Sequence, residues 1–204
     1  MKLLFLIVIY KVVMPILLKL VGVRFSHKTA YQEQKQFIVV ANHNSHVDTM
    51  ALLASMPVRL LTKTHPVATA NYFGKKKWLA FISNLLVNTV LIKQKDNALQ
   101  LLEEKLKKGH SLIFFPEGTR GKPGEMQAFR SGIGVLLQAF PHIPYIPVWI
   151  EGTGKILPKG SFLPVPFEAE VKIGSATLAK GASVEEIVEE VQTAIIDLRR
   201  REQL

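Results

Sequence analysis

The sequence contains no cysteine, and its first half contains very few acidic residues. The absence of cysteine excludes a disulfide framework, a thiolate metal site and a cysteine nucleophile. Residues 1–100 hold 13 Lys or Arg but only three acids, so the formal charge of +10 belongs entirely to this half. A basic half beside a neutral one favours an anionic partner surface, either phospholipid or nucleic acid.

Long uninterrupted hydrophobic runs are also missing from the otherwise apolar segment 1–24. Lys11, Pro15 and Lys19 interrupt it, whereas a spanning helix needs about 20 apolar residues with few or no charges. No small-residue cleavage site follows, so a signal peptide is not expected. We predict a membrane-associating segment of one or two helices that lie in one leaflet. A tilted span and a buried core helix are the alternatives.

The remaining residues, 25–204, are expected to form one domain, because 204 residues with 48% hydrophobic content suit a single core. Short apolar runs predict buried strands, and helical periodicity predicts helices between them. Their alternation predicts an α/β fold with a mixed, largely parallel central sheet flanked by helices. The expected strands are 37–41, 111–115, 145–150 and the half-buried 167–173, and the expected helices are 45–56, 96–108 and one that begins at a capping box of Ser183 and Glu186. Pro147 indicates an edge strand or a strand end.

The loop after strand 37–41 carries His43 and Asp48, and chemistry gathers in loops beyond the carboxyl ends of parallel strands. A carboxylate bound to one imidazole nitrogen leaves the other nitrogen as a proton acceptor. The same spacing also suits a plain helix start, with Ser45 as the N-cap and Asp48 near the helix dipole. A third alternative is a metal site formed with His46.

The loop after strand 111–115 contains Glu117, Gly118, Thr119 and Arg120. The glycine permits a close backbone approach, and the planar fork of arginine suits a phosphate or a carboxylate. Arg130 follows ten residues later in a second basic position. This loop is therefore the second candidate part of a functional site.

Three sequence blocks in this order resemble the motifs of the glycerolipid acyltransferase family, which includes bacterial 1-acyl-glycerol-3-phosphate acyltransferases. The blocks are Asn42-His43-(four residues)-Asp48, then Phe115-Pro116-Glu117-Gly118-Thr119-Arg120, then Ile146-Pro147-Val148. The resemblance covers roughly residues 37–150. It implies that His43 is the general base, that Asp48 orients it, and that Glu117, Gly118, Thr119 and Arg120 hold a phosphate-bearing acceptor. Arg130 matches a basic position of the family and is a further anion contact.

One family block differs. The family usually carries Gly-x-x-Phe-Ile-Asp-Arg between these motifs, and the best match here, residues 88–94, ends in Gln94 in place of the arginine. Lys93 supplies a positive charge there but lacks the bidentate fork. The identity of the acceptor headgroup is therefore open at this point.

The resemblance implies an O-acyltransferase of phospholipid biosynthesis. Such an enzyme moves a fatty acyl group from acyl-coenzyme A or acyl carrier protein to the hydroxyl of a lysophospholipid, and the expected acceptor is 1-acyl-sn-glycerol-3-phosphate. The thioester is a co-substrate, and no cofactor or metal is expected. The expected partner is anionic membrane lipid at the cytoplasmic face of the membrane, not nucleic acid. The alternatives are a different hydroxyl acceptor and a non-enzymatic lipid-binding or nucleic-acid-binding module.

Overall fold

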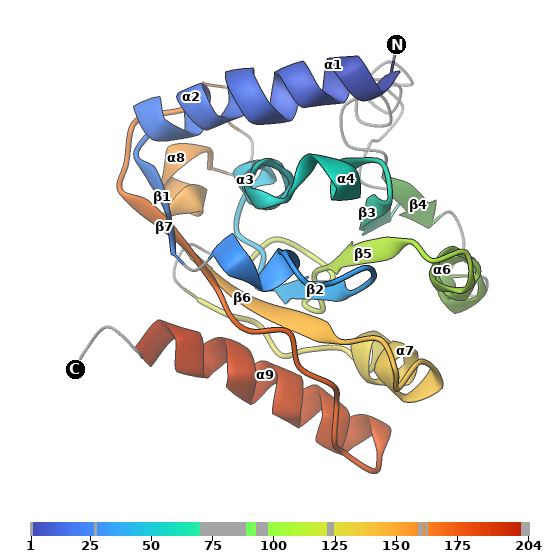
Figure 1. Ribbon diagram of the computed structural model, residues 1–204. Helices are drawn as coiled ribbons and strands as arrows, with labels where there is room; N and C mark the ends of the chain where they lie inside the picture. Colours follow the sequence, from blue (N-terminus) through green and yellow to red (C-terminus); the bar gives the residue numbers. More distant parts are fainter. Residues whose placement is uncertain are drawn as a thin grey trace.

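A seven-stranded sheet organises the chain in the computed structural model, which describes residues 2–26, 28–69, 89–92, 98–121, 125–158, 161 and 163–200 (Figure 1). The strand order is β1-β7-β6-β2-β5-β3-β4. Only the β6–β7 pair is antiparallel among the described strands, so the prediction of a mixed, largely parallel sheet is confirmed. The strands are β1 (Val23–Ser26), β2 (Ile38–Ala41), β3 (Thr64–Thr69), β4 (Val90–Ile92), β5 (Ser111–Phe114), β6 (Tyr145–Glu151) and β7 (Ala169–Ile173).

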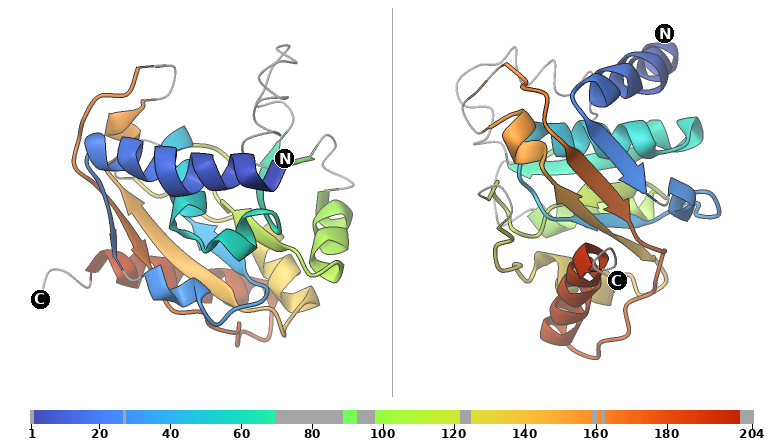
Figure 2. Two further views of the ribbon diagram at one scale, coloured as in Figure 1. Left: turned by 45° about the horizontal axis from the view of Figure 1, so that its top comes forward. Right: turned by 90° about the vertical axis from the view of Figure 1, so that its left-hand side faces the viewer.

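Helices cover both faces of this sheet, so the described residues pack into two hydrophobic cores (Figures 1 and 2). Alternate residues of β2 show this directly, because Val39 packs into one core and Val40 into the other. One face carries α1 (Lys2–Val8), the π-helical turn η1 (Ile9–Val13), α2 (Met14–Leu20), the 3-10 turn η2 (Lys28–Tyr31), α3 (His46–Ser55), α4 (Val58–Leu61) and α8 (Thr153–Ile156). The other carries α6 (Ala98–Lys107), α7 (Gly132–Ala139) and α9 (Val184–Arg200).

The predicted strands and helices agree with these elements to within a few residues. The C-terminal helix α9 begins where the capping box predicts, with Ser183 Oγ accepting from the Glu186 amide at 3.2 Å. Strand β7 is more enclosed than the predicted half-buried strand, because Lys172 is itself buried beside Glu170, 3.7 Å away. The apolar sequence pattern alone therefore understates how completely this strand is covered.

Pro147 lies in the middle of β6, an interior strand, so the prediction of an edge strand or a strand end is wrong. Opposite β6, Val148 pairs with Ile173 but Tyr145 pairs with Thr177, so the partner segment contains one extra residue between these two pairs. Such a bulge interrupts the regular hydrogen-bond ladder. It falls beside Pro147, where the strand has no N–H to donate, and this position lets an interior strand contain a proline.

The amino-terminal helices form one continuous rod across the outer face of the α3 layer (Figure 1). Leu6, Tyr10 and Leu18 pack into the core, whereas much of the opposite side is exposed and apolar. By length and composition, Leu3–Leu20 is the one described helix that could cross a membrane, and only 17% of it is buried. A buried core helix is therefore not what this segment forms.

Lys11 attaches this rod to the rest of the protein. It lies in the π-helical turn, and its ammonium donates to the carbonyl oxygens of Ala54, at 2.8 Å, and Met56. These residues are at the carboxyl end of α3, where orphan carbonyls and the helix dipole attract a cation. On a regular helix the three lysines of the sequence segment, Lys2, Lys11 and Lys19, would project in different directions, but the Lys11 ammonium binds the protein.

Replacing Lys11 with methionine should lower the free energy of unfolding by about 1–3 kcal/mol, because hydrogen bonds from a charged donor are lost at similar side-chain length. Thermal unfolding should shift down by about 2–4 °C per kcal/mol for a chain of this size. The exposed Lys19, replaced in the same way, is the matched control. Equal melting temperatures for the two variants would show that Lys11 does not hold the rod.

Candidate active site

Three loops meet at the carboxyl edge of the central strands. Residues 42–48 follow β2, residues 115–121 follow β5, and residues 152–153 follow β6. Because β2 lies between β5 and β6 and runs parallel to both, these three strands end at the same edge. The first two loops are the two that the sequence singles out.

Asn42 fixes where the first loop begins. Its side-chain amide donates to the Ile150 carbonyl, and its side-chain oxygen accepts from the Ile150 amide, both at 2.7 Å. The buried side chain thus extends the β2–β6 pairing beyond the end of β2. The next residue, His43, therefore leaves the sheet from a rigid position.

Asp48 is fully buried and collects hydrogen bonds from all sides of its carboxylate. Oδ2 lies 2.9 Å from His43 Nδ1 and accepts from the amides of Asn44, at 2.7 Å, and Ser45, at 2.8 Å. Oδ1 accepts from the Thr153 hydroxyl at 2.6 Å. The sequence offers the helix cap and the His–Asp pair as alternatives, but both are present. The Asp48 carboxylate caps the start of α3 and also binds the His43 ring.

This network fixes the proton arrangement of His43. A carboxylate that accepts from several N–H groups acts as an acceptor, so Nδ1 of His43 carries the proton and Nε2 keeps its lone pair. The imidazole ring also stacks on Phe115, with centroids 4.0 Å apart and planes at 20°. The histidine side chain remains 16% exposed. The imidazole is therefore fixed in orientation by Asp48 and Phe115, and its Nε2 can accept a proton.

Glu117 is buried inside the protein, whereas a residue that binds a substrate phosphate would be accessible. Glu117 is only 2% exposed, and its two oxygens accept from the backbone amides of His43, at 2.7 Å, and Gln127, at 3.0 Å. Burial raises the pKa of Glu117, and the hydrogen bonds from those amides partly offset the effect. In this arrangement the carboxylate connects the two loops, which the sequence motif alone does not reveal.

Two arginines flank the turn at Gly118. The glycine has φ of +75°, which favours glycine, and an added Cβ would lie 2.8 Å from the Arg130 guanidinium carbon and would displace that side chain. Thr119 is exposed beside it. Arg120 lies near Asp48, whose charge opposes the lowering of the Arg120 pKa by partial burial. The structure thus brings two of the predicted anion-binding residues to one turn, while Lys93 lies outside the described residues.

His46 is close enough to sense the same charges, although part of its side chain is exposed. Partial burial lowers the pKa of His46 to about 4, Arg120 and then His43 add to the effect, and Asp48 opposes it. The ring is therefore neutral at neutral pH. In the described part of the chain no three His, Asp or Glu side chains are grouped as metal ligands, so nothing in the geometry favours the metal-site alternative.

Three backbone amides of the first loop already donate to carboxylates inside the protein and are not free to stabilise an oxyanion. The His43 amide donates to Glu117, and the amides of Asn44 and Ser45 donate to Asp48. Their use by two buried carboxylates makes the loop rigid instead.

Thr153 is the residue of the site that sequence reasoning misses. It follows Gly152, whose φ of +79° turns the chain back from β6 so that the threonine reaches Asp48. The sequence feature that could have identified Thr153 is its position just after β6, a strand that ends at the same sheet edge as β2 and β5. Threonine after glycine is too common to be noticed without knowledge of strand order.

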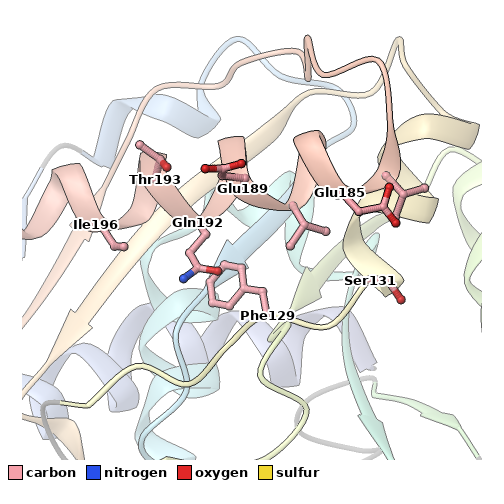
Figure 3. A pocket seen from close by; sticks show the side chains of 9 residues that line it. Phe129, Ser131, Glu185, Glu189, Gln192, Thr193 and Ile196 are labelled. Atoms are coloured by element: carbon pink, nitrogen blue, oxygen red, sulfur yellow. The ribbon is translucent and has the colours of Figure 1, made fainter.

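A separate groove of about 430 Å³ lies along α9, lined among others by Phe129, Ser131 and Gln192 (Figure 3). Its two loop residues flank Arg130, but neither His43 nor Asp48 contributes to it. The groove is therefore distinct from the His–Asp pair.

The fold and the site together define an α/β protein with a buried-carboxylate His–Asp pair at the carboxyl edge of its sheet. The Acyltransferase family model matches residues 22–151, so the chain belongs to the Acyltransferase family. That range contains the first two loops of the site and ends at the last residue of β6, just before Gly152 and Thr153.

Named relatives agree with this family. A chloroplast 1-acyl-sn-glycerol-3-phosphate acyltransferase of Brassica napus is 32% identical over 130 residues, which is 61% of this chain and 35% of that protein. A human 1-acyl-sn-glycerol-3-phosphate acyltransferase beta is 28% identical over 136 residues, 62% of this chain and 46% of that protein. The matched regions thus span about a third to a half of these relatives.

The fold also resembles a solved structure. The crystal structure of the 1-acyl-sn-glycerophosphate acyltransferase PlsC from Thermotoga maritima superposes with a TM-score of 0.70 at 25% identity, covering 95% of this chain and 81% of that one. The likeness thus extends beyond the family match to nearly the whole chain.

Replacing Glu117 with glutamine should lower the free energy of unfolding by about 1–3 kcal/mol, because an amide NH₂ would face a backbone N–H in a buried site. Chemical denaturation measures this difference. The exposed Glu125, further along the same loop, is the matched control and should change little when replaced by glutamine. Unchanged stability of the Glu117 variant would contradict the loop-connecting role.

Proposed function

We propose that this protein transfers a fatty acyl group from a thioester donor, acyl-coenzyme A or acyl carrier protein, to the hydroxyl of a lysophospholipid, and that the first acceptor to test is 1-acyl-sn-glycerol-3-phosphate. The observation that carries the proposal is the His43 imidazole, held 2.9 Å from the buried Asp48 carboxylate. The names of its relatives support the same substrate class.

In the proposed reaction, Nε2 of His43 takes the proton of the acceptor hydroxyl as its oxygen attacks the thioester carbonyl. The tetrahedral intermediate expels the thiolate, which takes the proton back from the imidazolium. Asp48 keeps the ring in the required tautomer and stabilises its positive charge. No covalent enzyme intermediate is needed, which suits a chain without cysteine.

The acceptor phosphate is assigned to the turn that carries Arg120 and Arg130. A guanidinium binds phosphate through two parallel hydrogen bonds, and such charge-assisted bonds are strong. Gln94 in place of the family arginine leaves a different headgroup as the alternative acceptor within the same chemistry.

Membrane attachment is assigned to the amino-terminal rod. Its exposed apolar side includes Leu4, Ile16 and Leu20, while its other side packs on the domain. That division of faces fits a helix that lies in one leaflet better than one that spans the bilayer. The basic first half of the chain would face anionic lipid. The cytoplasmic face of the membrane is part of the proposal, because the proposed thioester donors are soluble.

Replacing His43 with alanine should reduce acyl transfer by about 10²- to 10⁴-fold, because the general base is removed. Thiol release from acyl-coenzyme A in the presence of lysophosphatidic acid measures the rate, and circular dichroism should show an intact fold. The exposed His142, replaced by alanine, should keep full activity. Turnover at the normal rate in the His43 variant would exclude it as the base.

Replacing Arg120 with glutamine should raise the acceptor KM about 10- to 100-fold, because a charged hydrogen bond to phosphate contributes about 1.5–3 kcal/mol. The donor KM should stay near its normal value. The exposed Arg200, replaced by glutamine, controls for the loss of one positive charge. A change in donor KM alone would move the phosphate site away from this turn.

A further inference from the structure

A second exposed apolar segment lies far from the amino terminus in the sequence. Leu163, Val165 and Phe167 are 78%, 57% and 41% exposed, in the loop that leads from α8 into β7. Three large apolar side chains exposed along five residues are unusual on a protein surface that only water contacts. Neither the His–Asp pair nor the two arginines give them a role.

The backbone N–H groups of this segment do not need water as a hydrogen-bond partner. Across residues 163–167, all of which the structure describes, every amide N–H is either hydrogen-bonded or absent. Val165 donates to the Ile156 carbonyl at 2.8 Å, Phe167 donates to the Val21 carbonyl at 3.1 Å, and Leu163 donates to the Ser161 hydroxyl at 3.4 Å. The other two residues are prolines, which have no N–H. Unsatisfied backbone donors are costly outside water, and residues 163–167 present none.

The segment is fixed beside the carboxyl end of α2. The Phe167 carbonyl lies so close to Gly22 that a Cβ there would come within 2.6 Å of it, and Gly22 has φ of +88°. In both views of Figure 2 the described part of the loop rises on the same side of the molecule as α1–α2. Leu20, which is exposed at the end of α2, directly precedes Val21 and Gly22, two residues that contact Phe167.

A cation accompanies this surface. Lys155 Nζ lies 4.5 Å from the centroid of the Phe167 ring, a cation–π contact that holds a positive charge among the apolar side chains. Apolar side chains with adjoining lysine are typical of protein segments that contact anionic phospholipid. This charge favours a lipid surface over a neutral protein partner.

The segment is hydrogen-bonded to the helix that borders the site, because Val165 donates to the Ile156 carbonyl of α8. The chain around α8 contacts the site directly: Thr153 donates to Asp48, and Ser45 Oγ donates to the Leu157 carbonyl at 3.0 Å. We propose that residues 163–167 are a second membrane-contacting element that inserts Leu163, Val165 and Phe167 into the anionic bilayer surface beside α2. This rests on the proposed membrane attachment and adds to it that the loop brings the edge of the site carrying Thr153 to the lipid.

The absence of cysteine makes a direct test possible. Single cysteines replace Leu163, Ile16 or Leu178 in the full chain, and each is labelled with an environment-sensitive fluorophore. Ile16 reports on the amino-terminal rod, and Leu178 is an exposed leucine away from the proposed surface. The probe is a vesicle of phosphatidylglycerol and phosphatidylcholine, with lipid-borne quenchers to confirm contact with acyl chains. Emission should rise and shift to the blue at 163 and 16 but not at 178.

Each outcome has a distinct meaning. A response at 16 without one at 163 would overturn the second element and leave the proposed attachment by the rod intact. No response at either position would overturn both. A response at 163 that needs no vesicles and grows with protein concentration would identify a second copy of the chain as the occupant and overturn the lipid assignment.

A matched pair of substitutions gives an independent measure. Leu163→Glu should lower the vesicle partition coefficient by roughly tenfold, because an apolar side chain is replaced by a charge that anionic lipid repels. Leu178→Glu adds the same charge and should leave partitioning near its normal value. Equal partitioning of the two variants would contradict insertion of the loop.

Discussion

The buried carboxylate of Asp48 is the interaction on which the site depends. It binds the His43 ring, two amides at the start of α3 and the hydroxyl of Thr153. An ionised group without water must have such partners, and removing several of them would leave a costly unpaired charge. The same hydrogen bonds that make burial tolerable therefore also fix the ring. A substitution that weakens these hydrogen bonds would therefore both destabilise the fold and release the His43 ring.

The sequence predicts this part of the structure well because its cause is local. His43 and Asp48 are five residues apart across a helix start, and the capping geometry of Ser45 holds Asp48 close to the loop that carries His43. Thr153 and the partners of Glu117 depend instead on which strands are neighbours. That order is set by packing of both sheet faces, and no short pattern in the sequence contains it.

Two other features show where pattern reasoning fails. Pro147 is compatible with an interior strand only because the neighbouring segment bulges beside it, and that bulge belongs to residues about 30 positions away. The three lysines of the amino-terminal segment do not share a face on a regular helix, but the helix is not regular. Its π-helical turn at Ile9–Val13 directs Lys11 toward the protein. In both cases residues distant in the sequence, the bulge opposite Pro147 and the carbonyls that bind Lys11, allow a local structure that sequence patterns do not predict.

Helix α3 connects these features. Its first turn is held by Asp48, and its last carbonyls are held by Lys11 of the rod that we assign to the membrane. Ten helical residues rise about 15 Å, and a helix of that length packed in a core does not bend easily. The distance from the rod to the imidazole is therefore set by a rigid spacer held at both ends. In the proposed reaction, a lipid hydroxyl at the bilayer surface would therefore meet His43 at a fixed distance from the rod, without a large movement of the protein.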